Sequence, residues 1–211
     1  MQNTKRARST EAKQERLRHI IDASSMVLSH KMLNDFTMAD VVESTKLSKP
    51  AIYNYFATKE EILLQIYREE LRAWLDGMVS CVTASEVALD KRAFDELFVD
   101  SFCAASLLVK LTPQLTSTLE QNVSVGTYCA FKKETAKRMN EFAALLVSTG
   151  LCDAVQAQGL ALGYMTTLVG ALQVSAPAPF SDDELHHETV AFLKMMDFKT
   201  NCLASLSFLK V

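Results

Sequence analysis

The sequence predicts an all-α protein in which a small N-terminal helical domain precedes a larger helical domain. Its 211 residues include six glycines and four prolines, so few positions break a helix. Apolar residues recur every three to four positions along most of the chain, and no segment sustains the alternation of apolar and polar residues that marks a half-buried strand. Apolar residues make up 49% of the chain, which is enough for a packed core.

This spacing and the capping signals between segments predict about nine helices. The expected helices cover residues 10–31, two short segments within 37–56, 58–83, 90–110, a short segment from 112, 127–148, 153–174, and 181 toward the C-terminus. Thr112 followed by Pro113 indicates the start of the short helix. Gly150 indicates the end of the helix over 127–148. The Ala-Pro repeat at 176–179 ends the next helix, and Ser181 with three acidic residues after it starts the last one.

The charge distribution agrees with a division into an N-terminal domain at residues 1–58 and a C-terminal domain at 59–211. Residues 1–60 hold ten Lys and Arg against seven Asp and Glu, whereas 61–211 hold twelve against eighteen. The basic excess is greatest in residues 1–18, and about the first nine residues are expected to form a flexible basic tail. This asymmetry favours a polyanionic partner for the N-terminal end, although basic tails are also common as solvated chain ends.

The most informative segment is 36–63, FTMADVVESTKLSKPAIYNYFATKEEIL. Thr37 and Asp40 can cap a first short helix, because a hydroxyl and a carboxylate accept hydrogen bonds from the unpaired N–H groups there. That helix ends near Lys46, and Ser48 caps a second short helix. Two short helices joined by a tight turn and braced by a longer preceding helix form a helix-turn-helix.

The second short helix presents hydrogen-bond donors near its N-terminal end. Lys49, Tyr53 and Asn54 suit phosphate oxygens and base edges, and the small Ala51 permits close approach. Lys59 follows at the start of the next helix, where an ammonium and backbone amides together suit one phosphate. The alternative is that the aromatic residues of this segment only fill a helical core.

Residues 20–66 resemble the DNA-binding domain of the TetR family of bacterial transcriptional repressors. The matching residues are Thr37, Asp40, Val41, Ser48, Lys49, Ile52, Tyr53, Tyr55, Phe56, Lys59, Glu60 and Glu61, and their spacing needs no gap. Three residues depart from the usual pattern, and the first is Met32, where the family usually has a glycine after the first helix. Lys46 replaces the glycine of the turn, so we expect it to adopt a positive φ. Pro50 replaces a glycine in the second helix, where proline is tolerated but offers no N–H to a phosphate.

The resemblance implies a sequence-specific transcriptional regulator, a repressor that a small-molecule effector releases from its operator. It also implies a homodimer on a near-palindromic site in double-stranded DNA. Tyr55 and Lys59 are expected to contact phosphates. The full set of expected DNA-binding residues is Thr37, Met38, Ser48, Lys49, Pro50, Ala51, Tyr53, Asn54, Tyr55 and Lys59.

The C-terminal domain is expected to hold the effector pocket. The candidate lining residues are Trp74, Phe98, Phe102, Gln121, Tyr128, Phe131, Tyr164 and Met165. Because the apolar faces carry few charges, they suit an uncharged or hydrophobic effector. The alternative is that these side chains form solid core.

The last two long helices are expected to form the dimer interface, as the resemblance implies. Residues 153–174 include Gly159, Gly163 and Gly170, which permit close approach of another helix. That partner is either a helix of a second subunit or a helix of the same chain.

No catalytic or cofactor fingerprint accompanies the helix-turn-helix. The sequence has no GxSxG, HExxH, P-loop or dinucleotide pattern, so we expect neither an enzyme nor a cofactor. The five cysteines are scattered without a CxxC pair, which favours free, buried thiols over a redox switch and argues against a metal site. No apolar run reaches the roughly 18 residues of a membrane span, and the basic N-terminus lacks the apolar block of a signal peptide. The expected location is the cytoplasm, and the rival functions are a helical enzyme or a helical adaptor that does not bind DNA.

Overall fold

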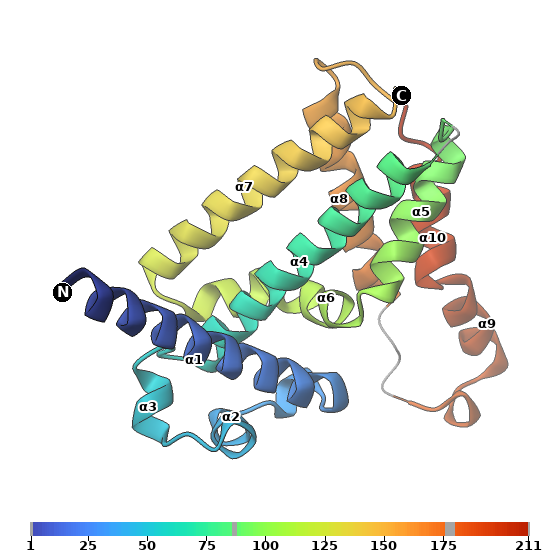
Figure 1. Cartoon of the computed structure of the whole chain (residues 1–211). Coiled ribbons are helices and arrows are strands. Elements are labelled where there is room, and N and C mark those ends of the chain that lie inside the picture. The colour runs from blue at the N-terminus through green and yellow to red at the C-terminus, as the bar shows by residue number, and fades with distance from the viewer. Residues whose placement is uncertain (1, 86–87, 176–179, 211) are drawn as a thin grey trace. The chain divides into compact units, whose positions relative to one another are not determined.

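The computed structural model describes residues 2–85, 88–175 and 180–210, with side chains from residue 11 onward. Within these ranges the protein consists of ten α-helices and short 3₁₀ and π turns, without a strand (Figure 1). The all-α prediction is therefore confirmed. The chain forms two compact units, Met1–Glu69 with Gln114–Phe131, and Glu70–Pro113 with Lys132–Val211. The helices α4 and α7 each begin in the first unit and continue into the second.

The first unit contains the short helices around the predicted turn. Its elements are α1 (Gln2–His30), the 3₁₀ turn η1 (Leu33–Asp35), α2 (Met38–Thr45), α3 (Lys49–Tyr53), the start of α4 (Lys59–Ala84), the π turn η3 (Leu115–Leu119), the 3₁₀ turn η4 (Glu120–Asn122) and the start of α7 (Val125–Ser148). The structure continues α1 back to Gln2, through the segment expected to be a flexible tail, while Met1 lies outside the described residues.

One apolar face of each helix forms the core of the first unit. Its buried side chains include Ile20, Ile21, Leu28, Phe36, Val41, Ile52, Phe56, Ile62 and Ile66. On α1 they recur at helical spacing, which places them on one stripe. Tyr67 and Phe131 meet edge to face, with ring centroids 6.0 Å apart, so the start of α7 packs against α4 within this unit.

The second unit is a bundle of longer helices. Besides the remainders of α4 and α7, it contains α5 (Lys91–Ala104), α6 (Ser106–Leu111), the start of the 3₁₀ turn η2 (Thr112–Gln114), α8 (Ala157–Val174), the 3₁₀ turn η5 (Asp182–Glu184), α9 (His187–Met195) and α10 (Phe198–Leu206). Gly150, at φ 76°, terminates α7 as predicted.

Two expected helices are each divided by a local break. The helix expected over 90–110 is interrupted at Ala105, whose ψ of 69° is not helical. The helix expected from residue 181 to the C-terminus is instead η5, α9 and α10. Asp197 adopts an extended ψ of 131°, and its carboxylate accepts a hydrogen bond from the backbone N–H of Thr200 at 2.9 Å. This cap starts α10 as a new helix, so the expectation of a long last helix was wrong.

Free thiols were expected for all five cysteines, and all five are free. The expectation of burial holds for Cys202 alone, since Cys81, Cys103 and Cys129 are exposed and Cys152 is half-buried. Burial raises the pKa of the Cys202 thiol to about 12. Among the described helices, none has the length and apolarity that crossing a membrane requires.

Candidate nucleic-acid interface

Helix α2 begins with the predicted capping box. The Thr37 hydroxyl accepts a hydrogen bond from the backbone N–H of Asp40 at 3.3 Å, and the Asp40 carboxylate accepts one from the N–H of Thr37 at 2.8 Å. The Lys31 ammonium donates to both oxygens of Asp40 at 2.8 Å. These contacts hold the pKa of Asp40 below its usual range, with the Lys31 hydrogen bond as the main cause. The start of α2 is therefore fixed to the end of α1.

The turn between α2 and α3 is tight and internally hydrogen-bonded. Lys46 has φ 58° and ψ 18°, the left-handed conformation, and its N–H donates to the carbonyl of Val42 at 3.0 Å. The Thr45 hydroxyl accepts from the N–H of Leu47 at 3.3 Å, and His19 on α1 hydrogen-bonds the Thr45 carbonyl at 3.1 Å. The positive φ predicted for Lys46 is confirmed, and α1 supports the turn directly.

Helix α3 is held by its own cap and by one buried anchor. The Ser48 hydroxyl accepts from the N–H of Ala51 at 3.4 Å, and Ile52 is fully buried. Pro50 lies in the first turn, where its missing N–H has no intrahelical acceptor to lose. The Lys49 ammonium lies 5.8 Å from the centre of the Tyr53 ring, which brings two of the predicted donors together.

The ten residues expected to contact DNA lie on or beside these capped elements. Six are exposed and four half-buried: Thr37, Ser48, Lys49, Pro50, Tyr53 and Asn54 are exposed, and Met38, Ala51, Tyr55 and Lys59 are half-buried. Lys59 has a contact that the sequence did not predict, because its ammonium donates to the carbonyl of Phe36 at 2.8 Å. An ammonium has three donors, so two remain for a phosphate.

A second set of contacts ties the start of α4 to the η4–α7 segment. The Glu61 carboxylate accepts from the backbone N–H of Ala57 at 2.8 Å and from the Thr127 hydroxyl at 3.1 Å. The Thr58 hydroxyl donates to the Asn122 carbonyl at 3.2 Å. We call these five residues the Glu61 link. Within the link, the Glu61 N–H also donates to the Thr58 hydroxyl at 3.2 Å, which caps the start of α4 locally. Thr127, in contrast, lies 66 residues beyond Glu61, so no local pattern predicts its contact.

The residues expected to line an effector pocket lie in different environments. Four belong to a packed aromatic cluster of the second unit, in which Trp74 lies 5.2 Å from Phe98 and 5.3 Å from Phe102, and Tyr164 lies 5.0 Å from Phe98, between ring centroids. The Tyr164 hydroxyl donates to Asp95, and burial raises the pKa of Tyr164. Of the others, Phe131 is buried, Met165 half-buried, and Gln121 and Tyr128 exposed.

Two family models cover most of the chain. Residues 20–66 match the model described as bacterial regulatory proteins of the tetR family, and residues 68–209 match the model described as the tetracyclin repressor-like C-terminal domain. The chain belongs to the TetR family. A crystal structure from Syntrophomonas wolfei, of a protein assigned to the TetR-family transcriptional regulators, shares the fold of this regulator with a TM-score of 0.58. The two chains are 14% identical, and the match covers 93% of each. No curated protein sequence matches this TetR-family chain.

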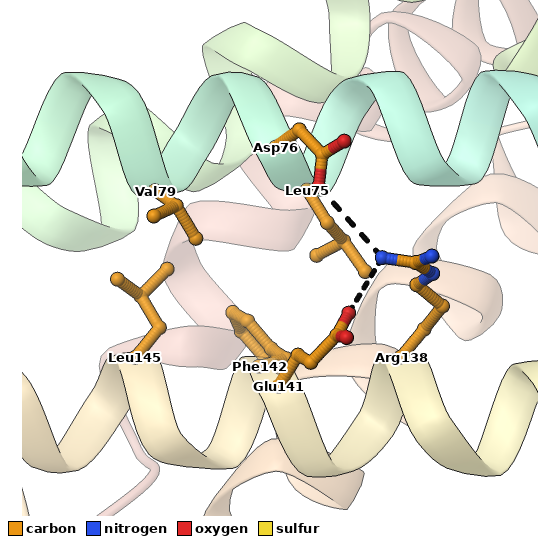
Figure 2. A pocket seen from close by; sticks show the side chains of 7 residues that line it. All are labelled: Leu75, Asp76, Val79, Arg138, Glu141, Phe142 and Leu145. Carbon is orange, nitrogen blue, oxygen red and sulfur yellow. Dashed lines mark hydrogen bonds and ion pairs between the residues drawn. The ribbon is translucent and has the colours of Figure 1, made fainter.

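The second unit of this TetR-family regulator contains a cavity that sequence reasoning missed. It has a volume of about 330 Å³. Its lining residues come from α4 and α7: Leu75, Asp76, Val79, Arg138, Glu141, Phe142 and Leu145 (Figure 2). None of the eight residues expected to line an effector pocket is among them. The pattern of large aromatic residues pointed to the core, whereas the cavity is lined mainly by aliphatic and charged side chains.

Arg138 is the most buried charged group of this cavity, with its side chain 10% exposed. Its Nε and Nη2 donate to Glu134 at 3.0 and 2.8 Å, and its Nη1 donates to Glu141 at 2.6 Å. Burial disfavours the charge of Arg138, but these carboxylates and Asp76 outweigh that effect and raise its pKa. The guanidinium is therefore charged, and each of its three nitrogens donates a hydrogen bond to a neighbouring carboxylate.

Proposed function

We propose that this TetR-family transcriptional regulator is a homodimeric repressor that binds a near-palindromic DNA operator through α3 and is released by a small-molecule effector. The observation that carries the proposal is the capped α3, which exposes Lys49 and Tyr53 on the helix and Asn54 at its C-terminal cap. Lysine and asparagine are donors for phosphates and base edges. A two-fold dimer would present two such helices to successive major grooves.

The exposed face of α8 supports the proposed dimer. Leu162 and Val169 are 60% and 41% exposed, and Gly159 and Gly170 on the same helix have open space where a side chain would be. Gly163, by contrast, lies 3.3 Å from the Leu209 methyl carbons, measured from the Cβ position that an alanine would occupy, so it serves packing within the chain. The proposed interface therefore uses the face of α8 that carries Gly159 and Gly170, and it does not include Gly163.

The Glu61 link supports the proposed release. It joins the residues directly after α3 to the η4–α7 segment, so a shift of that segment would reach the DNA-contacting surface. Coupling between effector and operator is typically about 1–3 kcal/mol and is reciprocal. DNA should therefore weaken effector binding as much as the effector weakens DNA binding.

The test is fluorescence-polarisation binding to the DNA directly upstream of the regulator's own gene, against scrambled DNA, across a salt series. Selective binding that weakens steeply with salt is expected, because phosphate contacts release counterions. Equal affinity for both DNAs, repeated across a library of genomic fragments, would contradict the proposal and favour a helical adaptor.

Two variants separate the proposed roles of the surface. Lys59→Ala should weaken binding to all sequences and reduce the salt slope by about 1, whereas Asn54→Ala should reduce discrimination by about 1–3 kcal/mol at one base pair. The exposed Lys133 on α7 provides a charge-matched control, since Lys133→Ala should leave both quantities unchanged. Thermal unfolding of each variant is measured in parallel, because Lys59→Ala also removes the hydrogen bond to Phe36.

A further inference from the structure

The cavity between α4 and α7 has an apolar wall and a charged wall. Figure 2 shows Val79 and Leu145 at one end and Arg138 at the other, with Asp76 and Glu141 flanking the guanidinium. The side chains of Asp76 and Glu141 are 58% and 41% exposed, so the charged end is open to solvent. A ligand can therefore place an apolar body against the aliphatic residues and keep one polar group near the carboxylates.

Three carboxylates surround Arg138 and disfavour an anion at this end of the cavity. Its guanidinium nitrogens are directed to Glu134 and Glu141, and the Asp76 carboxylate lies 3.7 Å from its Nη1. A negatively charged ligand would have to displace one of these carboxylates from a buried cation and would remain beside the others. Such like-charge contacts in a partly buried site disfavour binding.

The carboxylates of the cavity, in contrast, have weakly held partners on their outer side. The second oxygen of Asp76 lies 3.5 Å from Nε of Arg72, and the second oxygen of Glu141 lies 3.8 Å from the Lys137 ammonium. Arg72 and Lys137 are 66% and 61% exposed, and ion pairs of this kind contribute little to stability. An incoming ammonium can replace either cation at small cost.

We propose that this cavity binds a lipophilic amine, with its apolar body against Leu75, Val79, Phe142 and Leu145 and its ammonium at Asp76 and Glu141. This ligand keeps the hydrophobic body expected from the sequence but carries a positive charge in place of the uncharged character expected there. The proposal of a binding site depends on the cavity alone. The role of the amine as effector rests in addition on the proposed function.

Isothermal titration calorimetry with three probes of one carbon skeleton tests the ligand class in the absence of DNA. The probes are phenylpentylamine, phenylpentanol and phenylpentanoate, which differ in the charge of one terminal group. The amine is expected to bind about five-fold more tightly than the alcohol, and the carboxylate more weakly than both. Equal binding of amine and alcohol, or tightest binding of the carboxylate, would overturn the proposal.

Two variants test whether the preference for the amine over the alcohol arises at this cavity. Asp76→Asn should weaken amine binding about three-fold and leave alcohol binding unchanged, since Asp76 is exposed enough for the substitution to preserve the fold. Asp183→Asn removes the same charge at an exposed position outside the cavity lining and should change neither affinity. An amine affinity that falls equally in both variants would show that net charge, and not this cavity, selects the amine.

A separate measurement distinguishes the failure of this proposal from that of the proposed function. Operator affinity is measured with and without saturating phenylpentylamine. Amine binding at the cavity without any change in operator affinity would retain the site and reject its role as effector. Normal operator binding with no amine binding would reject the site and leave the regulator function intact.

Discussion

At the scale of the residue, the turn of the helix-turn-helix depends on one unfavourable backbone conformation. Lys46 has a left-handed φ of 58°, and it is the one non-glycine residue in the described chain with a positive φ. A side chain with a Cβ costs about 1 kcal/mol in that conformation relative to glycine. In this turn the Lys46 N–H donates to the Val42 carbonyl at 3.0 Å, and the Leu47 N–H donates to the Thr45 hydroxyl at 3.3 Å.

Replacing Lys46 should therefore stabilise the protein only when the new residue lacks a Cβ. We expect Lys46→Gly to be more stable than Lys46→Ala by about 1 kcal/mol, measured by urea denaturation at neutral pH. Both variants remove the same positive charge, so the difference between their free energies of unfolding measures the cost of the left-handed backbone conformation. Equal stability of the two variants would mean that the turn relaxes to another conformation.

At the scale of the element, hydrogen bonds distant in sequence complete helices whose caps are local. Helices α2 and α3 begin at caps that Thr37 and Ser48 provide within their own segments. The start of α4 has a local cap as well, but the Glu61 link adds Thr127 and Asn122 from the η4–α7 segment. The orientation of the residues that follow α3 therefore depends on a second part of the chain.

A double-mutant cycle measures this dependence. Glu61→Ala and Thr127→Val should each destabilise the protein, because each removes the hydrogen bond between the two side chains. The double variant should be less destabilised than the sum of the single variants by about 0.5–1.5 kcal/mol, since it loses that bond once. The control cycle pairs Glu61→Ala with Thr83→Val, an exposed threonine near the end of α4, and should be additive. Additivity in both cycles would contradict a stabilising contact between Glu61 and Thr127.

At the scale of the whole molecule, several apolar side chains remain exposed on the second unit. On α8, Leu162 and Val169 are exposed, whereas Leu160 and Tyr164 on the opposite face are buried. This face is the surface through which the proposed dimer would associate. It agrees with the proposed dimer and with the open space beside Gly159 and Gly170.

Charge on this face should prevent assembly. Leu162→Arg is expected to convert a dimer into a monomer in sedimentation velocity, since an unpaired guanidinium would be buried at the interface. Met26 on α1 is 71% exposed, so Met26→Arg adds the same charge elsewhere and should leave the dimer intact. If Leu162→Arg remained dimeric, the interface would lie on another face.

The sequence by itself determined the parts of this protein that depend on residues three or four positions apart. The Thr37 and Asp40 box, the Ser48 cap, the positive φ of Lys46 and the Gly150 end of α7 all follow from local hydrogen bonding and sterics. The apolar repeats likewise showed which helix faces are buried. These features were enough to predict an all-α fold with a helix-turn-helix near its N-terminus.

Tertiary structure alone decided what each buried or charged face meets. Periodicity marks Trp74, Phe98 and Tyr164 as inward-facing, but only packing brings them together as an aromatic cluster. Likewise, Arg138 and Asp76 lie on different helices, and no local sequence pattern predicts that their side chains line the same cavity. Contacts between segments depend on how whole helices pack, and that is a property of the complete chain and not of any window within it.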